Sequence, residues 1–318
     1  MKARMMMLTV GCGAVLLAAP WIGPSLLGEE GAFILLELRI PRTLMGALVG
    51  ATLGMTGAVY QTVFKNPLAT PSTVGTTAGA ALGALVAVVV FGGVSVGGGA
   101  LPLISLAAFL GALLVTAVIA VIASSGRATG NDVLLAGIAM TLAAGAVSTG
   151  LQFQADMAAT FEAIRWSLGN LQQVGYGGVL FLLPFVVGTL GVCLSQVRAL
   201  EAMVSGEEAA HSLGVDVPRT RALCLGVGAF GVGACVALCG PIAFVGLIVP
   251  HGVRLLLGAS RRVLLPMSAW AGAAFLPLCD ALGRVVVPGR ELPVGVLTAA
   301  IGAPLLVGLV YRQRHYNP

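Results

Sequence analysis

The stretch from Arg198 to Arg221, RALEAMVSGEEAAHSLGVDVPRTR, is the longest polar and amphipathic segment in an otherwise strongly apolar chain. Apolar residues recur in it at steps of three and four, with acidic residues and a histidine between them. This pattern predicts two short helices broken at Ser205-Gly206. Such a segment has one face for water and one for docking. It fits either a solvated loop between two membrane spans or a surface through which a partner moves the membrane part.

The rest of the chain has the composition of an integral membrane protein. Of its 318 residues, 58% are hydrophobic and 9% are charged, and the mean hydropathy is +1.01, which no soluble globular domain matches. A helix needs about 20 apolar residues to cross a hydrocarbon core of about 30 Å. The sequence therefore predicts an all-α, polytopic membrane protein, a single domain over 1–318 with about ten transmembrane helices. The apolar runs lie near 5–27, 43–64, 74–92, 101–123, 133–154, 178–197, 222–239, 242–257, 263–283 and 292–311.

Lysine and arginine are distributed unevenly between the two ends of these spans. An even number of spans puts both termini on one side, and basic residues favour the cytoplasmic side. With the N-terminus inside, twelve of the 17 basic residues lie inside and five outside. The polar segment and both termini are therefore expected in the cytoplasm, with the protein in the cytoplasmic membrane. The net charge of +5 reflects this topology rather than affinity for nucleic acid.

The motifs for ATP hydrolysis and for catalysis are missing. There is no GxxxxGK[ST] sequence, and the chain has two lysines, Lys2 and Lys65. Its six cysteines lie in apolar runs without a CxxC pair, so we expect buried thiols rather than a metal site. We expect no enzyme activity and no cofactor in this chain, and a partner that supplies the energy. The alternative, an ion-coupled secondary transporter, usually needs an acidic residue within the membrane, whereas the acids here lie at span ends.

Glycine and proline mark where the helices pack closely or break. The second span has glycines at 46, 50 and 54 and the third at 75, 79 and 83. Each is a doubled GxxxG pattern, which lets a neighbouring helix approach closely in lipid. Gly240-Pro241 and Pro250-His251 bracket a short apolar piece, so a broken helix is expected there.

Polar residues at the outer ends and in the fifth span suggest contact sites. Pro41 separates Arg39 and Arg42 at the mouth of the second span, which fits either a carboxylate-bearing partner or anchoring at the membrane surface. Asp280 and Arg284 are expected to pair at i, i+4. Asn131 and Asp132 suit N-caps for the fifth span. Within that span, the polar side chains suit a water-filled path or, equally, hydrogen bonds between helices; the candidates are Thr141, Ser148 and Gln152.

Seven short motifs occur in order along nearly the whole chain. They are Arg39-Ile40-Pro41-Arg42-Thr43; Lys65-Asn66-Pro67-Leu68-Ala69; Leu134-Leu135-Ala136-Gly137; Arg165-Trp166-Ser167-Leu168-Gly169; Gly206-Glu207-Glu208-Ala209-Ala210 with Leu213-Gly214; Gly240-Pro241 with Phe244 to His251; and Glu291-Leu292-Pro293-Val294-Gly295 with Ile301 to Pro304. Together they resemble the FecCD-type permeases of ABC importers for iron chelates, haem and cobalamin. Departures at Thr70, Asn170 and Ala243 leave the cargo open.

The resemblance implies a type II ABC importer permease fold that dimerises, with the translocation path at the dimer interface. Two cytoplasmic ATPase subunits, which bind Mg-ATP, would dock on coupling helices near 199–218. A periplasmic or lipid-anchored binding protein would dock on the outer face at Arg39, Arg42 and Arg284. The inner gate would lie near Gly130 and Asn131. The implied ATPase-coupling residues are Ser205, Gly206, Glu207, Glu208, Ala209, Ala210, Leu213 and Gly214.

Overall fold

The computed structural model describes residues 2–23, 31–91, 103–124, 128–171, 175–287 and 289–316, with side chains as far as residue 308. Arg127, one of the basic residues assigned to the inner side, lies outside these ranges. The regular elements are helices: α1 (Lys2–Ala18), η1 (Ala19–Trp21), α2 (Gly31–Phe33), η2 (Ile34–Arg39), α3 (Ile40–Val63), α4 (Thr76–Phe91), α5 (Leu103–Ser124), α6 (Gly130–Gln154), α7 (Met157–Ser167), α8 (Gly175–Ser195), α9 (Val197–Val204), α10 (Glu207–Ser212), α11 (Val217–Cys239), α12 (Val245–Leu257), α13 (Arg261–Gly283) and α14 (Val294–Tyr316).

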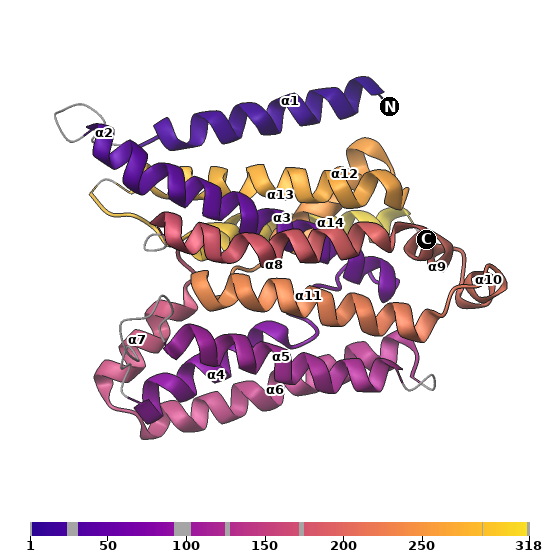
Figure 1. Ribbon diagram of the computed structural model, residues 1–318, viewed down its shortest axis with the longest axis horizontal. Coiled ribbons are helices and arrows are strands. Elements are labelled where there is room, and N and C mark those ends of the chain that lie inside the picture. Colours follow the sequence, from indigo (N-terminus) through magenta and orange to yellow (C-terminus); the bar gives the residue numbers. More distant parts are fainter. Residues whose placement is uncertain are drawn as a thin grey trace.

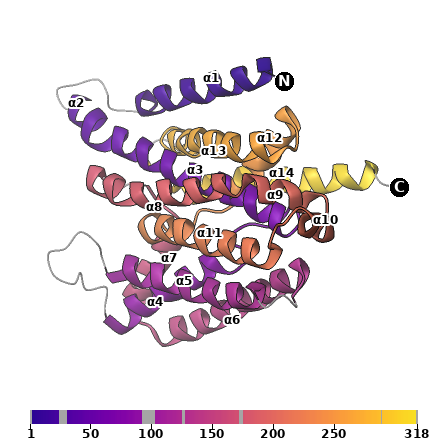
Figure 2. The same cartoon turned by 45° about the vertical axis from the view of Figure 1, so that its right-hand side comes forward.

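The long helices run roughly side by side, so the molecule has two distinct ends. Both termini lie at the same end as α9 and α10, whereas α2 and α7 lie at the other (Figure 1). The turned view gives the same arrangement (Figure 2). We call α9 and α10 together the elbow, the end that carries them the elbow end, and the other the α7 end. Common placement of the termini agrees with an even number of crossings.

The expected spans correspond to helices in the part of the chain that the structure describes. Six helices are long and apolar enough to cross a membrane, namely α1 with η1, α5, α6, α8, α11 and α13. Shorter apolar helices occur in α4, α12 and α14. The 24-residue α3 supplies the remaining span. The apolar run at 5–27 ends earlier than expected as a helix, because Pro20 directs the chain into the turn η1.

Helix α3 is buried along most of its length, and glycines allow this. A methyl group at Gly50 would overlap the backbone oxygen of Gly272 in α13, and one at Gly57 would overlap that of Gly246 in α12. Helix α4 packs on α5 in the same way, with Gly79 against Gly111. The close helix contacts expected from the GxxxG patterns are therefore confirmed.

The break expected around α12 is half right. Residues 240–244 are not helical, as Gly240-Pro241 indicated. However, α12 continues through Pro250. A proline at 250 leaves the carbonyl of Gly246 without its helical partner, and the amide nitrogen of Gln61 donates to that oxygen at 3.2 Å. The side chain from α3 therefore replaces the missing hydrogen bond, and the helix need not end.

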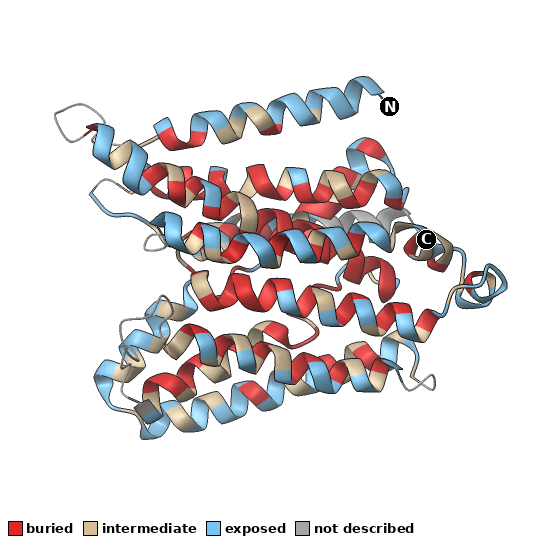
Figure 3. Cartoon of the chain, in the orientation of Figure 1, coloured by how far each residue is buried: buried red, intermediate tan, exposed pale blue. Residues whose placement is uncertain are grey.

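Burial differs strongly among the long helices. In Figure 3, buried residues predominate on α11 and α13, whereas α1 and α6 are largely exposed. Buried positions of α6 are limited to Val133, Gly137 and Ala144. All six cysteines are buried and carry free thiols.

Candidate functional site

The elbow has the predicted form of two short helices with a sharp corner. Helix α9 ends at Val204, and α10 starts at Glu207. Gly206 between them has a φ of 126°, a conformation that residues with a side chain rarely adopt. Leu200, Met203 and Ala210 are fully buried and dock the elbow on the bundle. The elbow is therefore a folded unit with a docking face rather than an extended loop.

The other face of the elbow is open to solvent. Leu213, which follows the end of α10, is a large apolar side chain with 71% of its surface exposed. Among the eight expected coupling residues, Ala210 is buried, while Gly206 and Ala209 are partly buried. The exposed ones are Ser205, Glu207, Glu208, Leu213 and Gly214.

Two carboxylates of the elbow contact residues of the bundle, and sequence reasoning missed both contacts. Glu201 of α9 accepts a hydrogen bond from the backbone nitrogen of Arg261 at 2.7 Å and so caps the start of α13. Glu207 of α10 forms an ion pair of 2.6 Å with Arg221 of α11. The elbow is thus joined by charged contacts to two different long helices.

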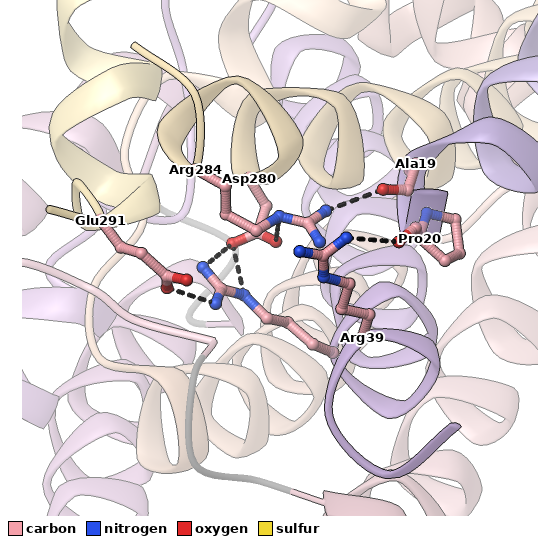
Figure 4. A network of polar contacts seen from close by, with 7 residues as sticks. Ala19, Pro20, Arg39, Asp280, Arg284 and Glu291 are labelled. Carbon is pink, nitrogen blue, oxygen red and sulfur yellow. Dashed lines mark hydrogen bonds and ion pairs between the residues drawn. The ribbon is translucent and has the colours of Figure 1, made fainter. Parts of the chain in front are cut away.

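At the α7 end, the three expected docking arginines gather in one buried cluster with two acids (Figure 4). Asp280 of α13 accepts from Arg42 at 2.7 Å, and its other oxygen lies 3.7 Å from Arg284. Arg42 also pairs with Glu291 at 2.7 Å. The predicted pairing of Asp280 with Arg284 is confirmed. The shorter contacts of Arg42 were not foreseen, because its partners are more than two hundred residues away in the chain.

This cluster also holds the end of the first span. Arg284 donates to the backbone oxygen of Ala19 at 2.8 Å, and Arg39 donates to that of Pro20 at 3.4 Å. Arg39 and Arg284 are about 95% buried, with exposures of 6% and 5%, whereas the Glu291 side chain is 44% exposed. The arginines therefore point into the protein, and an acid forms the accessible edge of the cluster.

Helix α6 begins one residue before Asn131, and its cap differs from the expected one. The N-cap is Thr129, whose hydroxyl accepts from the backbone nitrogen of Asp132 at 3.3 Å, while the Asp132 carboxylate accepts from the Thr129 backbone nitrogen at 2.8 Å. This reciprocal arrangement is a capping box. Asn131 is therefore not a cap; it is an exposed residue of the first turn, next to the partly buried Gly130.

The three polar residues of α6 share one side of the helix. Thr141 donates to the backbone oxygen of Gly137 at 2.9 Å. Ser148 and Gln152 line a small cavity of about 80 Å³ together with Trp166 of α7 and residues of α4 and α5. Thr141 and Ser148 are thus half-buried against their own chain, whereas Gln152 is exposed at the edge of this cavity. The exposed side of α6 is made of small and apolar residues, among them Ala139, Leu142, Ala143, Ala146 and Thr149.

Among the described residues, the bundle of long apolar helices, a folded polar elbow at one end and a buried charge cluster at the other define a multi-pass helical membrane protein of the permease class. The chain belongs to the FecCD transport family, whose model matches residues 4–312. This match extends from α1 into α14 and includes both polar ends.

Individual relatives are similar over shorter segments. The chain is 41% identical over 205 residues to the cobalamin import system permease protein BtuC of Halobacterium salinarum, covering 64% of this chain and 55% of that protein. It is 37% identical over 207 residues to the hemin transport system permease protein HmuU of Yersinia pestis, covering 65% and 62%. The aligned region spans less than two thirds of the length of these curated relatives.

The likeness in structure extends further. A solved structure, described as an inward-facing conformation of a metal-chelate type ABC transporter, matches with a TM-score of 0.87 and 27% identity. The match covers 98% of this chain and 100% of that one. The fold expected from the sequence is therefore confirmed.

Proposed function

We propose that this chain is the membrane-spanning permease subunit of a binding-protein-dependent ABC importer. Its cargo would be a bulky metal chelate, either a ferric siderophore, haem or cobalamin, and ATP hydrolysis in a partner chain would drive transport. The observation that carries the proposal is the elbow, which combines a firmly docked face with an exposed face in a chain of the FecCD transport family.

The exposed face of the elbow is the proposed contact for two cytoplasmic ATP-binding subunits. Leu213 offers an apolar anchor, and Ser205 and Glu208 add exposed polar groups to the same segment. An apolar centre with a polar rim is the usual composition of a protein interface. Placing the elbow end in the cytoplasm follows from the excess of basic residues expected on that side.

The exposed side of α6 is the proposed face toward a second copy of this chain. Small residues such as Ala139, Ala143 and Ala146 would let two helices or a bulky cargo approach closely. A path between two copies would place Gly130 and Asn131, at the elbow end of α6, where an inner gate is expected. Thr141 and Ser148 would then support α6 from its half-buried side, and the exposed Gln152 would remain a candidate for the path.

The arginine cluster is the proposed attraction site for a periplasmic or lipid-anchored binding protein. Within the cluster, three arginines face two acids, Asp280 and Glu291, an excess of one positive charge that favours an acidic surface at close range. Direct pairing with Arg42 would require a carboxylate of the binding protein to replace Glu291, the exposed member of the cluster.

The test is reconstitution of the full chain in proteoliposomes with its ATPase and binding protein. Uptake and ATP hydrolysis are measured with ferric siderophores, haem and cobalamin. We expect one class of cargo to stimulate hydrolysis and to accumulate. Uptake that follows an imposed ion gradient without the ATPase would overturn the proposal in favour of a secondary transporter.

A surface variant tests the elbow itself. Glu208→Lys with Leu213→Asp changes exposed side chains, so the chain should still insert and fold. Copurification of the ATPase should fall by at least about tenfold, equivalent to about 1.4 kcal/mol of contact energy. Glu162→Lys reverses a charge on α7, at the other end, and should leave copurification unchanged. Equal copurification in both variants would contradict docking at the elbow.

A further inference from the structure

The guanidinium group of Arg221 joins three separate elements at the elbow end. Arg221 lies in the first turns of α11 and is 2% exposed. Its Nη2 donates to Oε1 of Glu207 in α10 at 2.6 Å. Its Nη1 donates to the backbone oxygen of Ala128 at 3.0 Å. One side chain thus connects the elbow, α11 and the residue that precedes the cap of α6.

Burying the charge of Arg221 costs free energy, which indicates that this side chain does more than fill space. A buried charge is expensive unless it is fully hydrogen-bonded. The Nε of Arg221 is buried and has no hydrogen-bond partner among the described residues. An apolar side chain would pack at this position without that penalty. The arginine contributes what an apolar residue lacks, namely two directed bonds to two different elements.

The Ala128 carbonyl lies directly before the start of α6, so a force on it would act on this helix. Thr129, the next residue, is the N-cap of the helix and is locked to Asp132 by the capping box. A displacement of Ala128 is therefore passed directly to the first turn of α6. The helix itself has few buried residues to resist it, since Val133, Gly137 and Ala144 are the buried ones.

Glu207 is the opposite end of this connection. Its side chain is 49% exposed and belongs to the elbow face that we assign to the ATPase. A partner that presses on α10 therefore acts on the carboxylate that holds Arg221. The neighbouring Glu208 is also exposed but forms no ion pair within the described residues.

We infer that Arg221 is a positioning residue that couples the elbow to the start of α6. Movement of α10 is carried by Glu207 to the guanidinium, and from there to the Ala128 carbonyl and the gate region at Gly130 and Asn131. The inference rests on the proposed transport function, but the bridge itself can be tested without partners.

The first test is hydrogen exchange of the purified full chain in lipid nanodiscs. Arg221→Lys keeps the positive charge, yet a single ammonium group lacks the fork that reaches both acceptors. Amides in the first turns of α6, residues 130–137, should exchange about tenfold faster, as expected for loss of a hydrogen bond to a charged group. Arg219→Lys changes an exposed arginine in the same turn and should leave these amides as in the wild type.

The second test is the amount of cargo taken up per ATP hydrolysed in the reconstituted importer. Arg221→Lys and Glu207→Gln should each lower this ratio at least about fivefold, a typical size for coupling between two sites. Because Arg221 is buried, the ATPase should still copurify with Arg221→Lys. Arg219→Lys should keep the wild-type ratio. A residue with a merely structural role would lower uptake and hydrolysis together and leave the ratio unchanged.

The outcomes separate the inference from the proposed function. Wild-type exchange at residues 130–137 and a wild-type ratio in Arg221→Lys would overturn the inference, although ATP-driven uptake by the wild type would still stand. Absence of ATP-driven uptake in the wild type would reject the proposed function. Glu207→Gln alters a half-exposed side chain, so it tests the bridge even if Arg221→Lys fails to fold.

Discussion

Helices α3 and α6 are both rich in glycine, and the two use it in opposite ways. In α3, Gly50 and Gly57 touch the backbones of α13 and α12, and a side chain at either position would collide with them. In α6, Gly145 and Gly150 have open space around them. Glycine therefore gives close packing in α3. In α6 it packs closely at Gly137, against Val74, and leaves an open surface at Gly145 and Gly150.

This difference distinguishes α3, which is held by contacts within the chain, from α6, which has a side exposed for contact with another molecule. Helix α3 is buried along its length and is tied at the α7 end by Arg42 to Asp280. Helix α6 touches its own chain along one side, and the Arg221 bridge reaches the residue before its cap. An external push on the elbow should therefore leave α3 in place and change the position of α6.

The largest effect is expected when the tie between α3 and α13 is removed. Asp280→Asn leaves the buried arginines of the cluster without their shared carboxylate, and breaking a buried ion pair costs about 3–5 kcal/mol. The free energy of unfolding in detergent should fall by that amount. Glu291→Gln removes the half-exposed acid of the same cluster and should cost less than about 1 kcal/mol. Similar losses in both variants would contradict a buried lock.

A smaller effect is expected from adding one methyl group to each helix. Gly57→Ala forces α3 away from the carbonyl of Gly246, and overpacking of this kind costs about 1–3 kcal/mol. Gly145→Ala fills open space and should stabilise the isolated chain by up to about 1 kcal/mol, the difference in helix propensity. Thermal unfolding of the two variants in micelles measures whether each substitution lowers or raises the stability of the chain. If Gly145→Ala lowered the stability as much as Gly57→Ala, the proposed difference between the two helices would be wrong.

The smallest effect concerns the start of α6. Thr129→Ala removes the N-cap and should cost about 1 kcal/mol, seen as faster hydrogen exchange in the first turn of α6. Thr149→Ala, in the exposed middle of the same helix, should change stability by less than about 0.5 kcal/mol. If exchange near Thr129 stays as in the wild type, the start of α6 is held by more than its cap and the Arg221 bridge.

The sequence was sufficient where the signal is local. Hydropathy located the ten spans because each is one continuous apolar run, and the corner of the elbow was predictable from Ser205-Gly206. The cap of α6 was assigned wrongly to Asn131 and Asp132. The correct signal, a threonine at 129 three residues before an aspartate, was present in the sequence as a capping box.

Contacts between distant residues left no such signal. Arg42 meets Asp280 across most of the chain, and a single sequence gives no indication of that pairing. Arg221 was visible as a basic residue near the membrane surface, but its burial depends on how the elbow folds back. The polarity of Thr141, Ser148 and Gln152 was correctly noted, yet polarity alone does not say which neighbour a helix face meets.

The buried cysteines have a practical consequence for spectroscopy. All six thiols lie inside the bundle, away from water-soluble maleimides and spin labels. A single cysteine introduced at an exposed alanine outside the proposed partner faces, such as Ala158 of α7, would therefore be labelled selectively in the native chain. No native cysteine has to be replaced first, so the label reports on an otherwise unaltered protein.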